Sequence, residues 1–368
     1  MPQRFFVRLL ASTAAIAIGV GAWGQAPQDP VIVSGAVSVT RQGANTIVTQ
    51  STNRGVVDWR SFSIGPQETV RFDQPGRSSV TLNRVTGSEL SRIDGQLSAT
   101  GQVWLANPNG VLIGPGGRVN VAGLAATTGR VDVQEFLRSG RLSIDRIPRA
   151  GLIRNDGAIS IAEGGYAALA AASIRNKGVI SARAGSIALG SGRAMLLDFH
   201  GDRLIQFQVT EALDQAPIDA DALINAEGQM VAVDGQVQLT ARAAKGVIDN
   251  AINLKGHVVA NRVRVDGGTV TLGDGGAVRL SGRIDASNPQ DKGGAVSILG
   301  EAVGLMDDAS IDASGAKGGG EVLIGGDWQG MGGQNAAFAY VAPTATIKAD
   351  AVEKGDGGKV VVWADDST

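Results

Sequence analysis

The sequence predicts an all-β solenoid, in which short strands and tight corners stack coil upon coil around one shared core. Three observations support this fold class. Of 368 residues, 53 are glycine, and aromatic residues make up only 4% although apolar residues make up 43%. Short runs of Val, Ile, Leu and Ala alternate along the chain with Gly, Pro and Asn, which interrupt strands. Finally, the sequence repeats with a period of about 20 residues, which is typical of solenoids.

The repeat is clearest after residue 150. The segment Ile153–Ile159 (IRNDGAI) recurs 21 residues later as Ile174–Ile180 (IRNKGVI), and more loosely as Ile224–Met230 (INAEGQM). One coil cannot bury its apolar side chains alone, so stacked coils must share a core. We expect the chain to form about 15 coils at the spacing of parallel strands. Asn155 and Asn176 should stack and hydrogen-bond between neighbouring coils.

Further along the chain the repeat becomes less regular but persists. Ile284–Ser287 (IDAS) recurs as Ile311–Ser314, and Ile347–Asp350 is a looser copy. Each copy is followed by a Gly-Gly-x-Val unit. Two segments interrupt the pattern. Residues 129–150 carry more charge and predict a hairpin or loop outside the core with a helical turn, whereas residues 327–342 predict a loop inserted between two coils.

The N-terminal half contains the strongest turn signal, Asn107-Pro108-Asn109-Gly110. It separates two short apolar strands, residues 103–105 and 111–113, and a third strand is expected at residues 118–122. Proline fixes φ at one turn position, and Asn109 and Gly110 tolerate the left-handed backbone conformation of a sharp corner. The four residues therefore predict a corner of the solenoid.

Residues 1–24 predict a secretory signal peptide. Two arginines precede the uncharged apolar run Leu9–Ala22, which is shorter than the ~20 residues of a membrane-spanning helix. Ala22 and Gly24 are the small residues that signal peptidase requires, so cleavage is expected between Gly24 and Gln25. The alternative is a membrane anchor, which the short run disfavours. The mature chain would then leave the cytoplasm.

Composition argues against several kinds of chemistry. A net charge of −2 gives no general attraction to nucleic acid, and the absence of cysteine excludes disulfides and thiolate metal sites. His200 and His257 have no visible partners, so we predict no catalytic, cofactor or metal site. Asp94, Asp198 and Asp202 leave open a polysaccharide-cleaving solenoid, because such enzymes group carboxylates on one face. We favour solvated corners for these three acids.

Two stretches carry a resemblance to a known family. The segment Gly101–Thr128 (GQVWLANPNGVLIGPGGRVNVAGLAATT) and the preceding Asn83–Gly87 (NRVTG) resemble the N-terminal secretion domain of filamentous haemagglutinin-type exoproteins, the two-partner secretion family. Val57–Phe62 (VDWRSF) also fits the family pattern, and the later repeats resemble the family's stalk. The resemblance covers essentially all of residues 31–368.

The resemblance implies a fold and an export route. The fold would be a right-handed parallel β-helix with an N-terminal cap and a few extra-helical hairpins or loops. The chain would cross the periplasm and then the outer membrane of a Gram-negative bacterium through a β-barrel partner. It would be secreted or displayed at the cell surface. By motif, Asn107, Pro108, Asn109 and Gly110 match the family's secretion signature, and Asn83 and Arg84 match a second shared stretch.

For function, the resemblance implies a non-enzymatic adhesin or haemagglutinin-like stalk that contacts surface glycans or proteins of host or bacterial cells, and not nucleic acid. The alternatives are a polysaccharide-cleaving enzyme and a carrier for a C-terminal toxin. An autotransporter passenger is disfavoured, because the sequence shows no alternating membrane strands at its C-terminal end.

The predicted organisation is a signal peptide at residues 1–24, a cap and secretion domain at residues 25–150, and a repeat stalk at residues 151–368. Because the last residues look like the middle of a coil, we expect the stalk to be truncated there.

Overall fold

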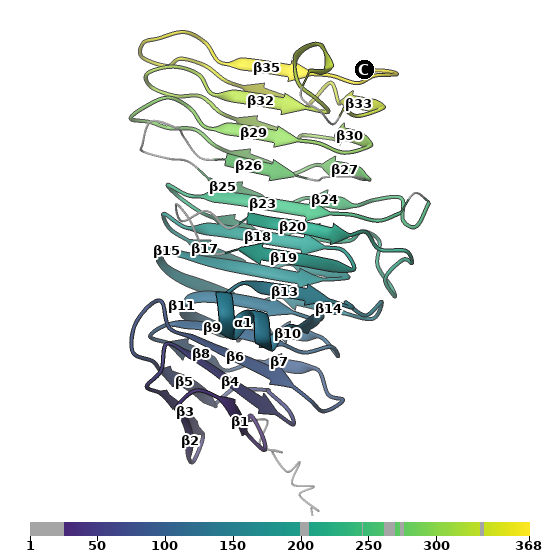
Figure 1. Cartoon of the computed structure of the whole chain (residues 1–368). Coiled ribbons are helices and arrows are strands. Elements are labelled where there is room, and N and C mark those ends of the chain that lie inside the picture. Colours follow the sequence, from purple (N-terminus) through teal and green to yellow (C-terminus); the bar gives the residue numbers. More distant parts are fainter. Residues whose placement is uncertain (1–25, 199–205, 245, 261–268, 273–275, 332–334) are drawn as a thin grey trace, which may run out of the picture.

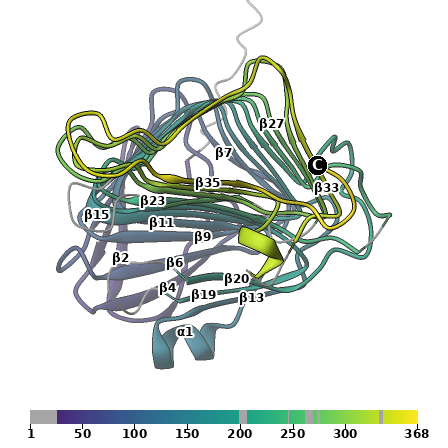
Figure 2. The same cartoon turned by 90° about the horizontal axis from the view of Figure 1, so that it is seen from above.

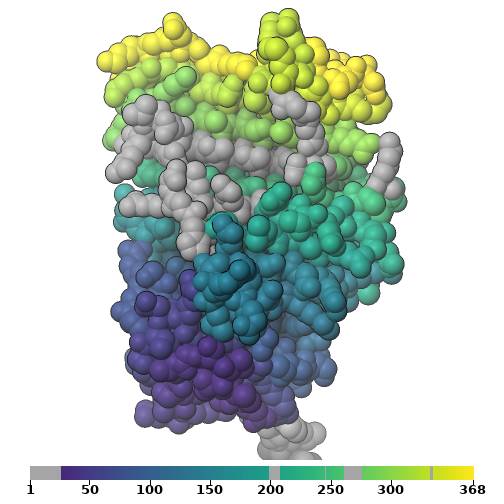
Figure 3. All heavy atoms as spheres, in the orientation of Figure 1, coloured from purple at the N-terminus to yellow at the C-terminus, as the bar shows by residue number. Residues whose placement is uncertain are grey.

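The computed structural model describes residues 26–198, 206–244, 246–260, 269–272, 276–331 and 335–368. Its strands stack into a parallel β-helix, and the chain climbs from the N-terminal coils (purple) to the C-terminal coils (yellow) (Figures 1 and 3). The predicted parallel β-helix with an N-terminal cap and extra-helical hairpins is confirmed. The predicted signal peptide, with Gly24 and Gln25, lies outside the described residues.

A full coil has three strands, one on each of three faces that we call A, B and C (Figure 2). Faces A and B belong to a 22-stranded sheet, and face C is a 9-stranded sheet. The parallel ladder of face A contains β3 (Asn45–Gln50), β5 (Thr69–Asp73), β8 (Gln96–Ala99), the first parts of β11 (Arg118–Thr127) and β15 (Ala158–Ala171), β17 (Val179–Ala182), β22 (Gln229–Val231), β25 (His257–Val259), β28 (Arg283–Asp285), β31 (Ser310–Asp312) and β34 (Thr346–Lys348).

The other two faces follow the same stacking order. Face B contains the later parts of β11 and β15, with β4 (Arg54–Trp59), β6 (Val80–Val85), β9 (Gln102–Ala106), β18 (Ser186–Ser191), β23 (Gln236–Ala241), β26 (Thr269–Leu272), β29 (Ala295–Ile298), β32 (Glu321–Ile324) and β35 (Lys359–Val362). Face C contains β7 (Ser91–Ile93), β10 (Val111–Ile113), β14 (Leu152–Asn155), β16 (Ser173–Asn176), β21 (Ile224–Ala226), β24 (Ile252–Leu254), β27 (Ala277–Leu280), β30 (Ala302–Leu305) and β33 (Phe338–Val341).

The strand register confirms the sequence repeat. Ile153 pairs with Ile174, and Ile174 pairs with Ile224, so equivalent isoleucines stack in successive coils. All three are fully buried. The predicted asparagine contact is also present, because Nδ2 of Asn155 donates to Oδ1 of Asn176 at 2.8 Å. Stacked identical residues therefore fix the register of these coils.

The abundance of glycine has a structural cause at the corner between faces C and A. A Cβ atom on Gly178 would lie 2.1 Å from the carbonyl oxygen of Gly157 in the preceding coil. A Cβ atom on Gly228 would lie 2.1 Å from the oxygen of Gly178, and one on Gly256 would lie 1.9 Å from that of Gly228. Backbones of neighbouring coils approach too closely here for any side chain.

The N-terminal cap closes the lower end of the stack by antiparallel pairing. β1 (Val31–Ser34) pairs with β4, and β2 (Val37–Gln42) pairs with β3. The core of the cap is aromatic, unlike the aliphatic core of the coils above. Trp59 and Phe62 have ring centroids 5.6 Å apart, and those of Phe62 and Phe72 are 6.5 Å apart.

Two excursions leave the coils and pair with each other. The predicted excursion at residues 129–150 is confirmed and contains β12 (Arg130–Val131), the short helix α1 (Val133–Ser139) and β13 (Leu142–Asp145). The second excursion, with β19 (Ala194–Asp198) and β20 (Gln206–Glu211), was not predicted. Together they form a 4-stranded sheet in the order β12-β13-β19-β20, and α1 lies outside face B (Figure 2).

Two expectations need correction. Residues 327–342 are not simply an inserted loop, because Phe338–Val341 is strand β33 of face C, and the described residues before it contain the short turn η1 (Trp328–Gly330). The strand was missed because its inward residue Ala339 is small while the aromatic Phe338 and Tyr340 point outward and are exposed. The described coils are also fewer than about 15, because the excursions and long corners take up part of the chain.

Candidate functional site

The predicted turn Asn107–Gly110 is a corner between faces B and C, between β9 and β10. The Asn107 side chain is fully buried. Its Nδ2 donates to the carbonyl oxygen of Glu89 at 3.0 Å and to Oγ of Ser91 at 2.9 Å. Its Oδ1 accepts from the backbone N–H of Asn109 at 2.9 Å, which closes a local side-chain turn. Asn107 thus joins its own corner to the corner of the preceding coil.

The rest of the turn divides into an exposed tip and a buried end. Pro108 and Asn109 are exposed, and Nδ2 of Asn109 donates to the carbonyl oxygen of Gly87 at 2.9 Å. Gly110 is buried with φ of +118°, a backbone conformation that side chains disfavour. Its carbonyl oxygen accepts from the N–H of Ser91 at 3.0 Å. Gly110 therefore adopts the positive φ that its residue type allows, whereas Asn109 does not adopt the left-handed conformation.

The second predicted stretch lies directly beside the first. Asn83 pairs in register with Leu105, and Arg84 pairs with Ala106, the residue before Asn107. Asn83 is fully buried, and its Oδ1 accepts from Nε1 of Trp59 at 2.9 Å. The structure therefore brings both sequence motifs together on adjacent strands.

Arg84 makes an ion pair across face B. Its Nε and Nη2 atoms donate to Oδ1 and Oδ2 of Asp58, each at 2.7 Å, in a bidentate arrangement. Both side chains are partly exposed, so the pair contributes geometry more than stability. Arg84 and Asp58 lie on β6 and β4, the two neighbouring strands that carry Asn83 and Trp59.

Helix α1 covers the outer side of the same strands. The ring of Phe136 packs against that of Trp104 with centroids 5.0 Å apart. Nε1 of Trp104 donates to the hydroxyl of Tyr166 at 2.7 Å, and that hydroxyl donates to Oε1 of Gln102 at 2.6 Å. Burial raises the pKa of the Tyr166 phenol above its ordinary value, although the Trp104 hydrogen bond opposes this.

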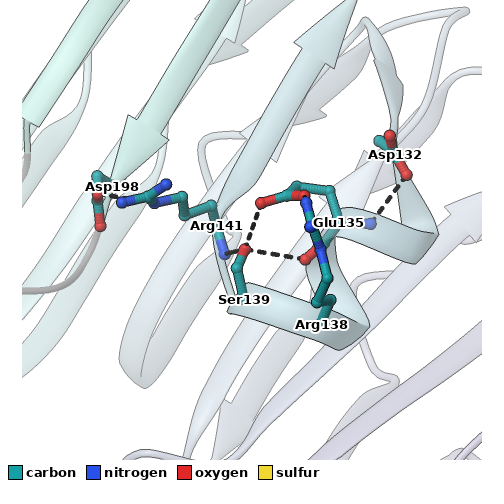
Figure 4. Close-up of polar contacts among 6 residues, drawn as sticks. All are labelled: Asp132, Glu135, Arg138, Ser139, Arg141 and Asp198. Atoms are coloured by element: carbon teal, nitrogen blue, oxygen red, sulfur yellow. Dashed lines mark hydrogen bonds and ion pairs between the residues drawn. The ribbon is translucent and has the colours of Figure 1, made fainter.

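Figure 4 shows how the first excursion is held. Oδ1 of Asp132 accepts from the N–H of Glu135 at 2.9 Å and caps α1. Oγ of Ser139 donates to the Glu135 carboxylate at 2.7 Å, and this bond, followed by one from a neighbouring arginine, lowers the pKa of Glu135. Nε of Arg141 pairs with Oδ2 of Asp198 at 2.9 Å, which ties the first excursion to the second.

The acids that left an enzyme open do not converge in the described structure. Asp94 follows β7 on face C and pairs with Arg92, whereas Asp198 ends β19 in the outer sheet. Asp202 and His200 lie outside the described residues. His257 is on β25 of face A. Among the residues that the structure describes, no group of three His, Asp or Glu side chains could hold a metal ion.

The sequence did not reveal a buried polar network inside the cap. Oγ1 of Thr81 donates to Oε1 of Gln50 at 2.7 Å and accepts from Nε2 of Gln74 at 2.9 Å. Oε1 of Gln74 accepts from the N–H of Gly101 at 2.9 Å. These bonds cross three coils and lie where the core would otherwise be apolar. Glutamine at strand ends, with Thr81 between apolar residues, was the only available signal.

The three faces and the hydrogen-bonded cap define the chain as a capped parallel β-helix. The family model described as the TPS secretion domain matches residues 24–298. The chain therefore belongs to the two-partner secretion family, whose members are secreted or surface proteins of Gram-negative bacteria and whose secretion domain implies export through an outer-membrane partner. The match runs through residue 150, so the proposed division of the chain there stays a prediction. In the described part of the chain, no helix combines the length and apolarity that crossing a bilayer requires.

Solved and curated relatives agree with this assignment. The secretion domain of HMW1 from Haemophilus influenzae superposes with a TM-score of 0.78 at 26% identity, over 93% of this chain and 95% of that one. The filamentous hemagglutinin secretion domain superposes with a TM-score of 0.50 at 18% identity, over 92% of this chain and 100% of that one, and it shares the fold. A heme/hemopexin-binding protein of Haemophilus influenzae is 48% identical over 102 residues, which is 28% of this chain and 11% of that protein. The match thus spans about a tenth of that curated relative.

Proposed function

We propose that the Asn107–Gly110 corner, together with Asn83 and Arg84, makes the chain competent for export by ordering the N-terminal coils that an outer-membrane β-barrel transporter handles. The observation that carries this proposal is the convergence of the two motifs, since Arg84 pairs with Ala106 directly before Asn107. The bonds of Asn107 to Glu89 and Ser91 then join that corner to the preceding coil.

The exposure of each residue favours a structural role for most of the motif. Asn107 and Asn83 have no exposed surface, so they can act on a transporter only through the fold of the cap. Pro108 and Asn109 are exposed and are the positions through which a direct contact would act. We assign the export role chiefly to the ordered corner and not to a surface epitope.

Beyond export, we propose that the coils serve as an adhesin or haemagglutinin-like stalk that presents its lateral faces to surface glycans or proteins. Support comes from the relatives, because the HMW1 secretion domain shares this fold over most of the chain and part of a heme/hemopexin-binding protein is similar in sequence. The carrier for a C-terminal toxin remains the alternative role for the same stalk.

The export proposal is tested by coexpressing the chain with its outer-membrane partner and measuring the released protein. Deletion of residues 31–128 should abolish release, and Asn107→Ala should reduce it strongly. Asn155→Ala is the matched control, because Asn155 is equally buried and also bonds a neighbouring coil but lies in the stalk. Release of the Asn107 variant at the unaltered level would refute the proposal.

Pro108→Ala and Asn109→Ala distinguish a role of the corner through the fold of the cap from a direct contact with the transporter. If the corner acts through its fold, these variants of exposed residues should be released nearly normally. If release falls while the variants remain as stable as the unaltered chain, the transporter contacts the tip directly, and the structural assignment is wrong.

A further inference from the structure

A recess runs along the corner between faces C and A, because this corner is shorter in several successive coils than in the coil above them. In five successive coils this corner is a two-residue unit ending in glycine: Asp156-Gly157, Lys177-Gly178, Glu227-Gly228, Lys255-Gly256 and Ser281-Gly282. At the upper end, the corner lengthens to the four residues 306–309. Leu280 pairs with Leu305 and Ile284 pairs with Ile311, so the strands stay in register and the two extra residues must project outward.

A second long corner occurs lower in the stack, where the Asp156-Gly157 corner separates it from the recess. The corner between β10 and β11 is the four-residue unit Gly114–Gly117, and the adjoining strands are again in register with the coil above. The short corners below residues 306–309 line an open recess with a volume of about 730 Å³, which extends from the Lys177-Gly178 corner to Asp308. That volume is within the range of small-molecule sites. The stacked glycines leave its floor without side chains.

The walls of the recess are mainly polar, and Val179 adds one exposed apolar side chain at the lowest coil. One wall contains Lys177, Glu227 and Lys255 from the corners, and the other contains Gln229, His257, Arg283 and Ser310 from face A, with Asp308 at the upper end. Nζ of Lys177 pairs with the Glu227 carboxylate at 3.3 Å. Lys255 and Arg283 lie beside His257, because His257 pairs in register with Arg283, and Nη2 of Arg283 contacts Oδ2 of Asp285 at 3.5 Å. This end of the recess therefore concentrates hydrogen-bond donors, with Asp285 and Asp308 as the accompanying acids.

We propose that the recess binds a linear acidic glycan that lies along the stack axis and directs a carboxylate at Lys255 and Arg283. This inference rests on the proposed surface-binding role and names its ligand class. Polar side chains recur at the coil spacing of about 4.8 Å, which is close to the repeat of an extended β-1,4-linked pyranose chain, so successive sugars can face successive coils. The guanidinium fork of Arg283 suits a planar carboxylate.

The geometry disfavours an extended peptide. Peptides that add a strand need a free sheet edge, but the backbone at this corner is already paired. The N–H of Gln229 donates to the oxygen of Gly178 at 2.9 Å, and the N–H of His257 donates to that of Gly228 at 3.1 Å. A nucleic acid is also disfavoured, because two acids accompany the three strong cations of the recess and the chain has a net charge of −2.

The test uses the full secreted chain and calorimetric titration with two hexasaccharides that differ only at C6: β-1,4-linked mannuronate and its neutral counterpart, mannohexaose. We expect the mannuronate to bind and the neutral sugar to bind at least about tenfold more weakly, since bonds to charged groups exceed neutral ones. Lys255→Gln with Arg283→Gln should weaken mannuronate binding by at least about tenfold. Arg130→Gln with Lys317→Gln makes the same charge change outside the recess and should not weaken it.

The outcomes separate this inference from the proposed adhesive role. Equal affinity for both sugars, no binding of mannuronate, or full affinity in the Lys255 and Arg283 variant would each overturn the recess assignment. Cells displaying that variant report on adhesion independently. If they adhere normally, the recess is not the adhesive site although adhesion stands. If mannuronate binds but the unaltered chain mediates no adhesion, the glycan site stands and the adhesin proposal fails.

Discussion

Replacing Asn107 with alanine should loosen one corner of the cap and leave the distant coils intact. The substitution removes three hydrogen bonds, to the carbonyl oxygen of Glu89, to Oγ of Ser91 and from the N–H of Asn109. It also removes a fourth, from Nδ2 of Asn109, which keeps its bond to the oxygen of Gly87. Each of the first three bonds contributes about 1 kcal/mol net, so the local opening free energy should fall by about 3 kcal/mol. Because Asn107 is fully buried, water cannot replace these partners without rearrangement.

Amide hydrogen exchange measures this effect at individual residues. The N–H of Ser91 donates to the oxygen of Gly110 at 3.0 Å and reports on the corner. In Asn107→Ala, its exchange should accelerate more than about 100-fold, which corresponds to about 3 kcal/mol. The N–H of Ile174, bonded to the oxygen of Leu223 at 2.8 Å, reports on a distant coil and should not change. Unchanged exchange at Ser91, or equal acceleration at both amides, would refute the local role of Asn107.

Three further predictions test the packing of the coils and the excursion. Gly178→Ala places a Cβ atom 2.1 Å from a backbone oxygen and should lower the melting temperature sharply, whereas Gly357→Ala, with nothing within 4 Å, should not. Burial raises the pKa of Tyr166, so the neutral phenol contributes fully to the free energy of unfolding below the unfolded-state pKa of about 10, and this contribution is lost as pH rises further. In Tyr166→Phe, the free energy of unfolding in urea should therefore depend less on pH between about pH 9 and 12. Phe136→Ala removes a buried ring from Trp104 at a cost of about 3–5 kcal/mol, and limited proteolysis should then cleave near α1 while the coils resist. Equal melting temperatures for the two glycine variants, an unchanged pH profile, or unaltered cleavage would contradict the respective argument.

The coil register was predictable because identical residues recur at identical positions. The 21-residue shift between Ile153 and Ile174 in the sequence is the strand register of β14 and β16 in the structure. Asn155 and Asn176 could be paired for the same reason. A solenoid makes the relation between sequence repeat and spatial neighbour direct, since each coil contacts only the next ones.

The second excursion could not be predicted in the same way. β13 pairs with β19 antiparallel, with Leu142 opposite Leu197, although a complete coil and more separates them in sequence. Neither segment matches the repeat, and their pairing depends on the coils, which place the end of β11 and the end of β18 on the same face with only β15 between them. The outward residues of face B beneath them include Ala125, Ala168 and Ala188, which are buried although they point away from the core. Small buried residues on an outward row were the signal that a covering layer exists.

The motif residues were predictable as turn formers but not as a connected unit. Asn107 and Gly110 have backbone requirements that their residue types reveal. The contact between Asn83 and Trp59 depends instead on the register of β4 with β6, which no repeat in the cap indicates. A buried asparagine is recognisable only once its partners are placed.

The position of the Asn107 corner explains why one turn should matter more than the others. β7 and β10 are the first two strands of face C, so the Asn107–Gly110 corner leads into the second strand of that face, directly above the coil in which the three-faced helix begins. Below it, the core is aromatic and closed by antiparallel strands; above it, equivalent aliphatic residues stack from coil to coil. The backbone N–H of Asn107 also donates to the oxygen of Thr127 at 2.9 Å, in the next coil. Bonds to the coils on both sides make this corner the link between cap and stalk, and a defect there deprives every later coil of an ordered template, whereas a defect at Asn155 affects only its neighbours.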